Sequence, residues 1–174
     1  MPELAFQFST SPAFASQIIR RLTHSRFSHI DLILPDEGLL GVSGIDKPTK
    51  DPGGVRIRPF NAWTYLFPPK IARVQCSDYV AKRGIEWGRG EIGKPFDKGA
   101  LWHFLRDRAG APPLGRDWRD PTHWICSEYQ ARLTEYSGLF TYPLIVPKDV
   151  ISPNDLLLLL NPYMTATNIE EFLR

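Results

Sequence analysis

A cysteine and a histidine stand at positions in this sequence where a nucleophile and its base could be held. Cys126 lies in "HWICSEYQARL" (123–133), at the predicted start of a helix, and His29 opens the predicted strand "HIDLIL". A thiol attacks as thiolate, and both the N–H groups of a helix N-terminus and a nearby imidazolium lower the pKa of a thiol. The same N–H groups can stabilise an oxyanion. If folding brings them together, Cys126 could act as nucleophile and His29 as general base.

The other cysteine and histidines have plain structural interpretations. Free cysteine is among the most buried residue types, so a core role for Cys126 stays open as the alternative. Cys76 ends a predicted strand with no histidine near it in the sequence, which favours a structural role. His24 suits the C-terminal end of a helix, where positive charge is favourable. His103 and His123 are predicted to be structural or solvated.

The elements that must position these side chains alternate between strands and helices. Alternating apolar and polar residues predict strands, and apolar stripes bounded by caps and glycines predict helices. The first helix is expected to use Ser11 as N-cap and Pro12 in its first turn, and the cysteine helix to stop at Gly138. Because hairpins join most strands, the sequence predicts an α+β fold with an antiparallel sheet, in one domain over 1–174. Strands are expected at 4–10, 29–34, 39–43, 55–60 and 70–76, and helices within 11–25, 79–93, 98–107, 124–138 and 150–160.

Composition and charge argue against several classes of function. The 174-residue chain has 43% hydrophobic residues, 23% charged residues and a net charge of +2. These values are ordinary for a soluble protein and do not indicate a nucleic-acid partner. No apolar run is long enough to span a bilayer, and the N-terminus does not resemble a secretion signal, so a cytoplasmic location is expected. No residues have metal-ligand spacing and no phosphate-binding glycine loop is present, so we expect no metal and no cofactor.

Several segments, taken in order, resemble a known family. They are "FQFSTS", "SRFSHIDLIL", "GLLGVSG", "GGVRIRPF", "EIGKPFD" and "WICSEYQARL". Over residues 4–140 the chain is similar to the circularly permuted, YiiX-like branch of the NlpC-type papain-like cysteine hydrolases, especially its phage and prophage members. In that branch the histidine strand precedes the cysteine helix, as it does here. The resemblance implies a small antiparallel sheet packed on helices, Cys126 as nucleophile at a helix N-terminus, His29 as base, and a C-terminal extension over 141–174.

The resemblance also implies a third polar residue that orients the histidine. In the family this residue normally lies on the strand after the histidine strand, and its equivalent here falls at Gly41 or Val42, which have no suitable side chain. Ser43, on the same strand and on the same face as Gly41 by two-residue alternation, is the candidate orienting residue. Asp31, two residues after His29 on the same face of its strand, is the alternative, as is a backbone carbonyl or a water.

The activity implied by the resemblance is that of a cysteine amidase or endopeptidase. It would cleave an amide bond in peptidoglycan peptides through an acyl-enzyme, with a peptide or cell-wall fragment as substrate. Two alternatives stay open: a non-catalytic phage virion or tail-assembly protein with phage structural proteins as partners, and a lipid amidase or acyltransferase using the same pair. An apolar groove beside Cys126 would favour a lipid substrate, and a polar, open cleft a peptide. Asp97 and Trp124 are predicted either to line the cleft or to be structural.

Overall fold

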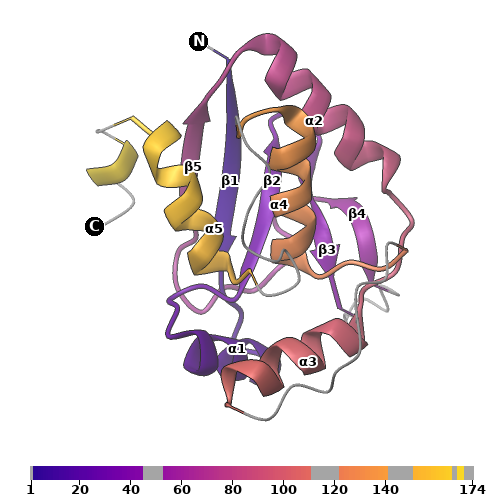
Figure 1. Cartoon of the computed structure of the whole chain (residues 1–174), viewed down its shortest axis with the longest axis vertical. Helices are drawn as coiled ribbons and strands as arrows, with labels where there is room; N and C mark the ends of the chain where they lie inside the picture. The colour runs from indigo at the N-terminus through magenta and orange to yellow at the C-terminus, as the bar shows by residue number, and fades with distance from the viewer. Residues whose placement is uncertain (1, 45–52, 111–121, 141–150, 166–167, 171–174) are drawn as a thin grey trace.

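The sheet lies at the centre of the molecule, and helices cover one of its faces (Figure 1). The computed structural model describes residues 2–44, 53–110, 122–140, 151–165 and 168–170. Within them, five antiparallel strands form one sheet in the order β4-β3-β2-β1-β5, which confirms the predicted α+β class. The strands are β1 (Glu3–Ser9), β2 (His29–Leu34), β3 (Gly38–Ser43), β4 (Gly54–Arg58) and β5 (Lys70–Gln75), and the helices are α1 (Phe14–Thr23), α2 (Asp78–Gly90), α3 (Lys98–Arg108), α4 (Cys126–Ser137), α5 (Pro153–Leu160) and the short 3-10 helix η2 (Asn161–Tyr163).

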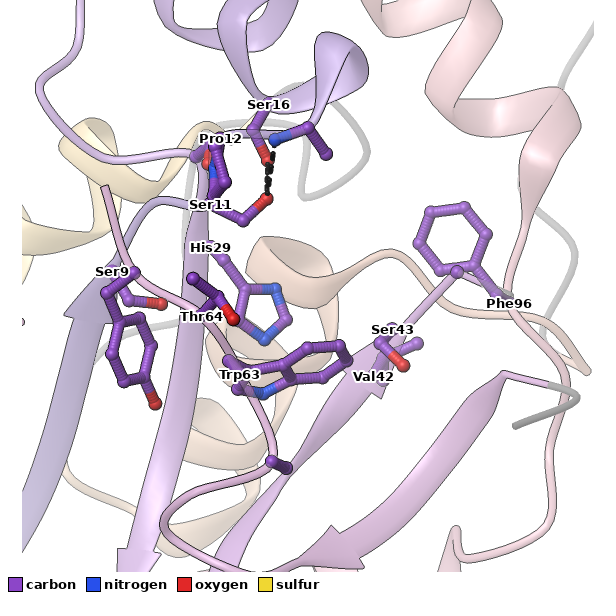
Figure 2. A pocket seen from close by; sticks show the side chains of 15 residues that line it. Ser9, Ser11, Pro12, Ser16, His29, Val42, Ser43, Trp63, Thr64 and Phe96 are labelled. Carbon is purple, nitrogen blue, oxygen red and sulfur yellow. Dashed lines mark hydrogen bonds between the residues drawn. The ribbon is translucent and has the colours of Figure 1, made fainter. Parts of the chain in front are cut away.

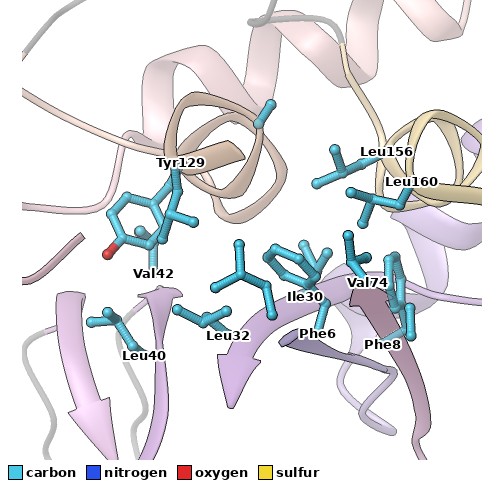
Figure 3. Close-up of a cluster of buried hydrophobic side chains, with 14 of the residues drawn as sticks. Phe6, Phe8, Ile30, Leu32, Leu40, Val42, Val74, Tyr129, Leu156 and Leu160 are labelled. Atoms are coloured by element: carbon cyan, nitrogen blue, oxygen red, sulfur yellow. The ribbon is translucent and has the colours of Figure 1, made fainter. Parts of the chain in front are cut away.

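One face of the sheet is apolar because its strands carry hydrophobic residues at alternate positions. These side chains pack against α4 and α5 in a continuous buried cluster (Figure 3). The cluster thus fixes α4 over the middle of the sheet. The strand members of the cluster include Phe6, Phe8, Ile30, Leu32, Leu40, Val42 and Val74, and its helix members include Tyr129, Leu156 and Leu160.

Within the described residues no helix is long and apolar enough to cross a membrane.

The opposite face of the sheet is polar and is also covered. Gln7 and Asp31 are paired neighbours on β1 and β2, and both are buried. The segment that follows β4 lies over them, since the Gln7 amide donates to the Tyr65 hydroxyl at 2.8 Å. Arg58, 5% exposed, donates to the backbone oxygens of Gly41 and Gly54. Polar groups buried away from water require partners, and on this face Gln7 and Arg58 find them in Tyr65 and in backbone carbonyls.

Helices α2 and α4 approach closely at Gly88. A Cβ at this position would lie 2.8 Å from Tyr129 Oη and 2.9 Å from Leu133 Cδ1. The Tyr129 hydroxyl also donates to the Gly88 carbonyl at 2.8 Å. The missing side chain of Gly88 is therefore what lets the cysteine helix pack against its neighbour.

Gly88→Ala is expected to destabilise the fold by about 1–3 kcal/mol, because the added methyl overpacks the contact between α2 and α4. Gly90→Ala is the matched control in the same helix, because nothing lies within 4 Å of its added Cβ. Its stability should stay within about 1 kcal/mol of the parent. Urea unfolding of both variants measures the difference. Equal changes in the two variants would contradict the proposed close packing.

Two boundary predictions were wrong. Helix α1 begins at Phe14 with Ala13 as N-cap, because the Ser11 hydroxyl bonds instead to Ser16 Oγ at 2.8 Å. Helix α2 ends at Gly90, since the following backbone forms a turn that reaches Gly93 with positive φ. Near the end of α4, Tyr136 is 50% exposed and stacks on Trp87 of α2.

The segment after α4 joins the same core. Ser152 caps α5 through a capping box, as its Ser-Pro pair predicts. Leu156 and Leu160 of this helix are fully buried against the sheet. Asn168 accepts from Arg73 N at 2.7 Å on β5. Residues 151–165 and 168–170 of the predicted extension therefore pack as part of the domain. Residues 141–150, 166–167 and 171–174 of the extension fall outside the described residues.

Candidate functional site

Strand β2 presents His29 and Asp31 on the polar face of the sheet. The two side chains point the same way because residues two apart on a strand share a face. His29 Nε2 lies 2.9 Å from Asp31 Oδ2, and the carboxylate is 1% exposed. The contact is a close ion pair rather than an aligned hydrogen bond, since neither atom has a partner in hydrogen-bonding geometry among the described residues. Asp31 therefore holds one side of the imidazole.

Helix α4 brings Cys126 to the same place. Cys126 is the first residue of the helix, and Ile125 before it supplies no side-chain cap. The helix therefore presents backbone N–H groups at its N-terminus that no N-cap side chain satisfies. Cys126 Sγ lies 3.9 Å from the carbonyl oxygen of Ser28, the residue before His29, and the thiol is half-buried. The structure thus brings together the cysteine and histidine that the sequence separates.

The charge state of His29 is set by these neighbours. Burial of the ring lowers the pKa of His29, but the negative charge of Asp31 and the close contacts of the ring with Asp31 and Cys126 outweigh burial and raise this pKa to about 10. The imidazole is consequently held as imidazolium at neutral pH. By contrast, burial raises the pKa of the Cys76 thiol, which has no histidine beside it. Of the two cysteines, Cys126 is the one that contacts His29.

A cavity of about 760 Å³ opens beside His29. Figure 2 shows the imidazole at its centre, with the indole of Trp63 beside it and Phe96 across the opening. The two rings of His29 and Trp63 meet edge to face, with centroids 6.0 Å apart. The guanidinium of Arg58 also lies over the Trp63 ring, 5.6 Å from the ring centroid. The segment after β4 thus places an aromatic wall directly against the histidine.

Hydroxyl groups line the other parts of this cavity. Ser11 and Ser16 are bonded to each other near the start of α1, as the dashed line in Figure 2 marks. Ser43 is 6% exposed, and its Oγ has no partner among the described residues. The Nε1 of Trp63 is likewise buried without a described partner. Two buried polar groups beside the cavity therefore have no hydrogen-bond partner among the described residues.

The candidate orienting residues from the sequence have different surroundings. Asp31, the alternative, makes the close contact with His29. Ser43 lines the same cavity, but nothing in the structure joins its hydroxyl to the imidazole. Asp97 caps α3 by accepting from Ala100 N at 2.7 Å, and Trp124 is buried and donates to Glu91 at 2.8 Å. Both of these residues therefore have the structural role.

Trp63 is the site residue that sequence reasoning missed. It lies in "NAWTYLFPP" (61–69), between β4 and β5, where no regular pattern marks its partner. A run of aromatic residues and prolines between two strands is the signal that could have indicated a structured cover for the sheet.

Among the described residues, no three metal-binding side chains are grouped to hold a metal ion.

Comparison with known proteins does not assign the chain to a family. No protein-family model matches the sequence, and a search of curated proteins finds no match. The role of the site is therefore argued from its residues and their geometry.

Proposed function

We propose that this protein is a cysteine hydrolase that cleaves amide bonds, with Cys126 as nucleophile and His29 as acid and base. The observation that carries the proposal is the series Asp31, His29, Cys126 at the N-terminus of α4. A nucleophile, a base beside it and a third group that orients the base are the parts that acyl-transfer chemistry requires. The half-buried thiol at an uncapped helix start suits attack better than core packing.

The first half of the reaction forms an acyl-enzyme. The Cys126 thiolate attacks the carbonyl carbon of the amide, and the oxyanion that develops is stabilised by backbone N–H groups at the start of α4. Because Asp31 occupies Nε2, the other ring nitrogen of His29, Nδ1, is the one left to face the thiolate. Imidazolium at Nδ1 gives its proton to the leaving nitrogen as the C–N bond breaks. The amine departs, and a thioester remains on Cys126.

The second half consumes one water. Neutral His29 takes a proton from the water as its oxygen attacks the thioester carbon. The C–S bond breaks, the carboxylic acid leaves, and the thiolate and imidazolium are restored together. The Asp31 carboxylate favours the imidazolium each time it forms, so it stabilises the starting state of every cycle.

The order of elements supports a permuted papain-like fold for this hydrolase. The histidine strand β2 precedes the cysteine helix α4 in the chain, and both meet at one end of an antiparallel sheet. Helix α4 packs across β2 and β3, where the hydrophobic cluster holds it. On this proposal peptidoglycan peptides are one substrate class, as the sequence resemblance implies.

The cavity favours a second candidate, an amide whose acyl group is apolar. Trp63, Phe96 and Val42 supply apolar surface beside His29. Among the lining residues that the structure describes, His29 alone carries a charge at neutral pH, and this charge is paired with Asp31. Apart from this paired imidazolium, charged peptide groups would find no opposite side-chain charge on the described walls. An apolar acyl chain would bury surface here, beside His29.

Matched amides of one chromogenic amine test the proposal and separate the substrate classes. One set carries short peptidoglycan-type peptides, and the other carries neutral acyl chains of increasing length. Release of the amine and an acyl adduct on Cys126, located by mass spectrometry after acid quenching, is the expected result. Faster turnover of the acyl set would favour the second candidate. If the folded protein gives neither amine nor adduct with both sets, the result would favour the non-catalytic alternative.

A further inference from the structure

Gly41 lies directly across from Asp31 on the neighbouring strand. The register pairs Leu32 with Leu40, so the next positions outward, 31 and 41, are opposite each other. Opposite residues in an antiparallel pair point to the same face, and their Cβ atoms are about 5 Å apart. Position 41 is therefore the place on β3 whose side chain would share space with the Asp31 carboxylate.

The carboxylate already fills that space. A Cβ built on Gly41 would lie 1.9 Å from Asp31 Oδ1 and 2.9 Å from Asp31 Cγ. No atom pair tolerates such distances, so one of the two side chains has to be missing or displaced. Gly41 has no positive φ, so its backbone conformation is open to any residue. The three described atoms nearest to the added Cβ all belong to Asp31, so the demand for glycine at this position comes from the carboxylate.

The carboxylate is also confined on its other side. Gln7 is its partner on β1, and the Gln7 amide is bonded to the hydroxyl of Tyr65. With Gln7 on one flank and Gly41 on the other, the 1% exposed Asp31 side chain is held toward His29. The empty position on β3 thus determines where the negative charge sits.

We infer that Gly41 is a positioning residue of the site, which acts by leaving the space that lets the Asp31 carboxylate reach the His29 ring. The inference rests on the proposed function for its catalytic meaning, but the coupling between residues 41 and 31 has consequences of its own. Any side chain at 41 has to move the carboxylate away from Nε2. Burial of the ring then disfavours the imidazolium, as it does for any buried histidine without an anion.

The test compares Gly41→Ala with Asp31→Ala and with the double variant. NMR titration of His29 and the rate at which a chloroacetamide alkylates Cys126 at pH 7 are measured in each protein. Gly41→Ala should bring the pKa of His29 from about 10 down to 6.5 or below, and should slow alkylation at least about tenfold. In the Asp31→Ala background the same change should have no further effect, because the carboxylate it displaces is gone. Gly90→Ala, which meets nothing within 4 Å, is the control.

Each outcome decides the inference. A His29 pKa that stays near 10 in Gly41→Ala would overturn it, and so would an equal loss of pKa in both backgrounds, since Gly41 would then act independently of Asp31. If Gly41→Ala fails to fold, a folded double variant supports the steric conflict with Asp31, and an unfolded one overturns it. These readouts need no substrate, so a coupled His29 titration in a protein that hydrolyses nothing would leave this inference standing while the hydrolase proposal fails.

Discussion

Replacing Cys126 by alanine is expected to abolish amide hydrolysis, with kcat/KM falling by about 10³-fold or more. The change removes the sulfur that forms the thioester, so no acyl-enzyme can form. The fold should survive, because Cys126 is half-buried at the first position of α4 and the packing of this helix comes from residues further along it. Hydrolysis of the amide identified from the matched sets measures the effect.

Cys76→Ala is the matched control for this variant. Cys76 is half-buried after β5, and burial raises the pKa of its thiol. We expect its activity to stay within about twofold of the parent, because it has no contact with the site. In the parent protein a chloroacetamide should likewise label Cys126 well before Cys76, since only thiolate reacts. Equal, slow labelling of both cysteines would contradict a catalytic Cys126.

Asp31→Asn is expected to have the second largest effect, a fall in kcat/KM of about 10²–10⁴-fold at pH 8. The amide keeps the shape of the side chain but removes the charge that raises the pKa of His29. Burial then becomes the main influence on the ring and lowers its pKa to the ordinary value of 6.5 or below. At pH 8 the variant therefore holds neutral imidazole, which can neither stabilise the thiolate nor protonate a leaving amine.

The pH profile of activity shows in which direction the Asp31→Asn change shifts the pKa of His29. In the parent protein His29 stays protonated until the pH approaches about 10, so activity should fall on the alkaline side only near that pH. In Asp31→Asn the same fall should occur at or below pH 6.5. Asp36→Asn makes the same charge change on an exposed turn and should leave the profile in place. An alkaline limb that does not move in Asp31→Asn would show that Asp31 does not control His29.

The sequence alone determined the elements and the residues with chemical capacity. Two-residue alternation and turn residues marked the strands, and an apolar stripe ending at Gly138 marked the cysteine helix. These signals are local: they depend on a few neighbouring residues and on backbone preferences that act wherever the segment folds. The same locality explains why Cys126 could be placed at a helix N-terminus before any tertiary contact was known.

Only the tertiary structure decided which group holds the histidine. Ser43 and Asp31 both lie on the predicted face, and strand periodicity cannot choose between them. The choice follows from strand register, which sets Gly41 opposite Asp31 and leaves room there for a carboxylate. The aromatic wall from Trp63 was equally out of reach, since its contact with His29 joins a loop to a strand more than thirty residues away. Such contacts are set by packing between distant segments, and no local pattern in the chain encodes them.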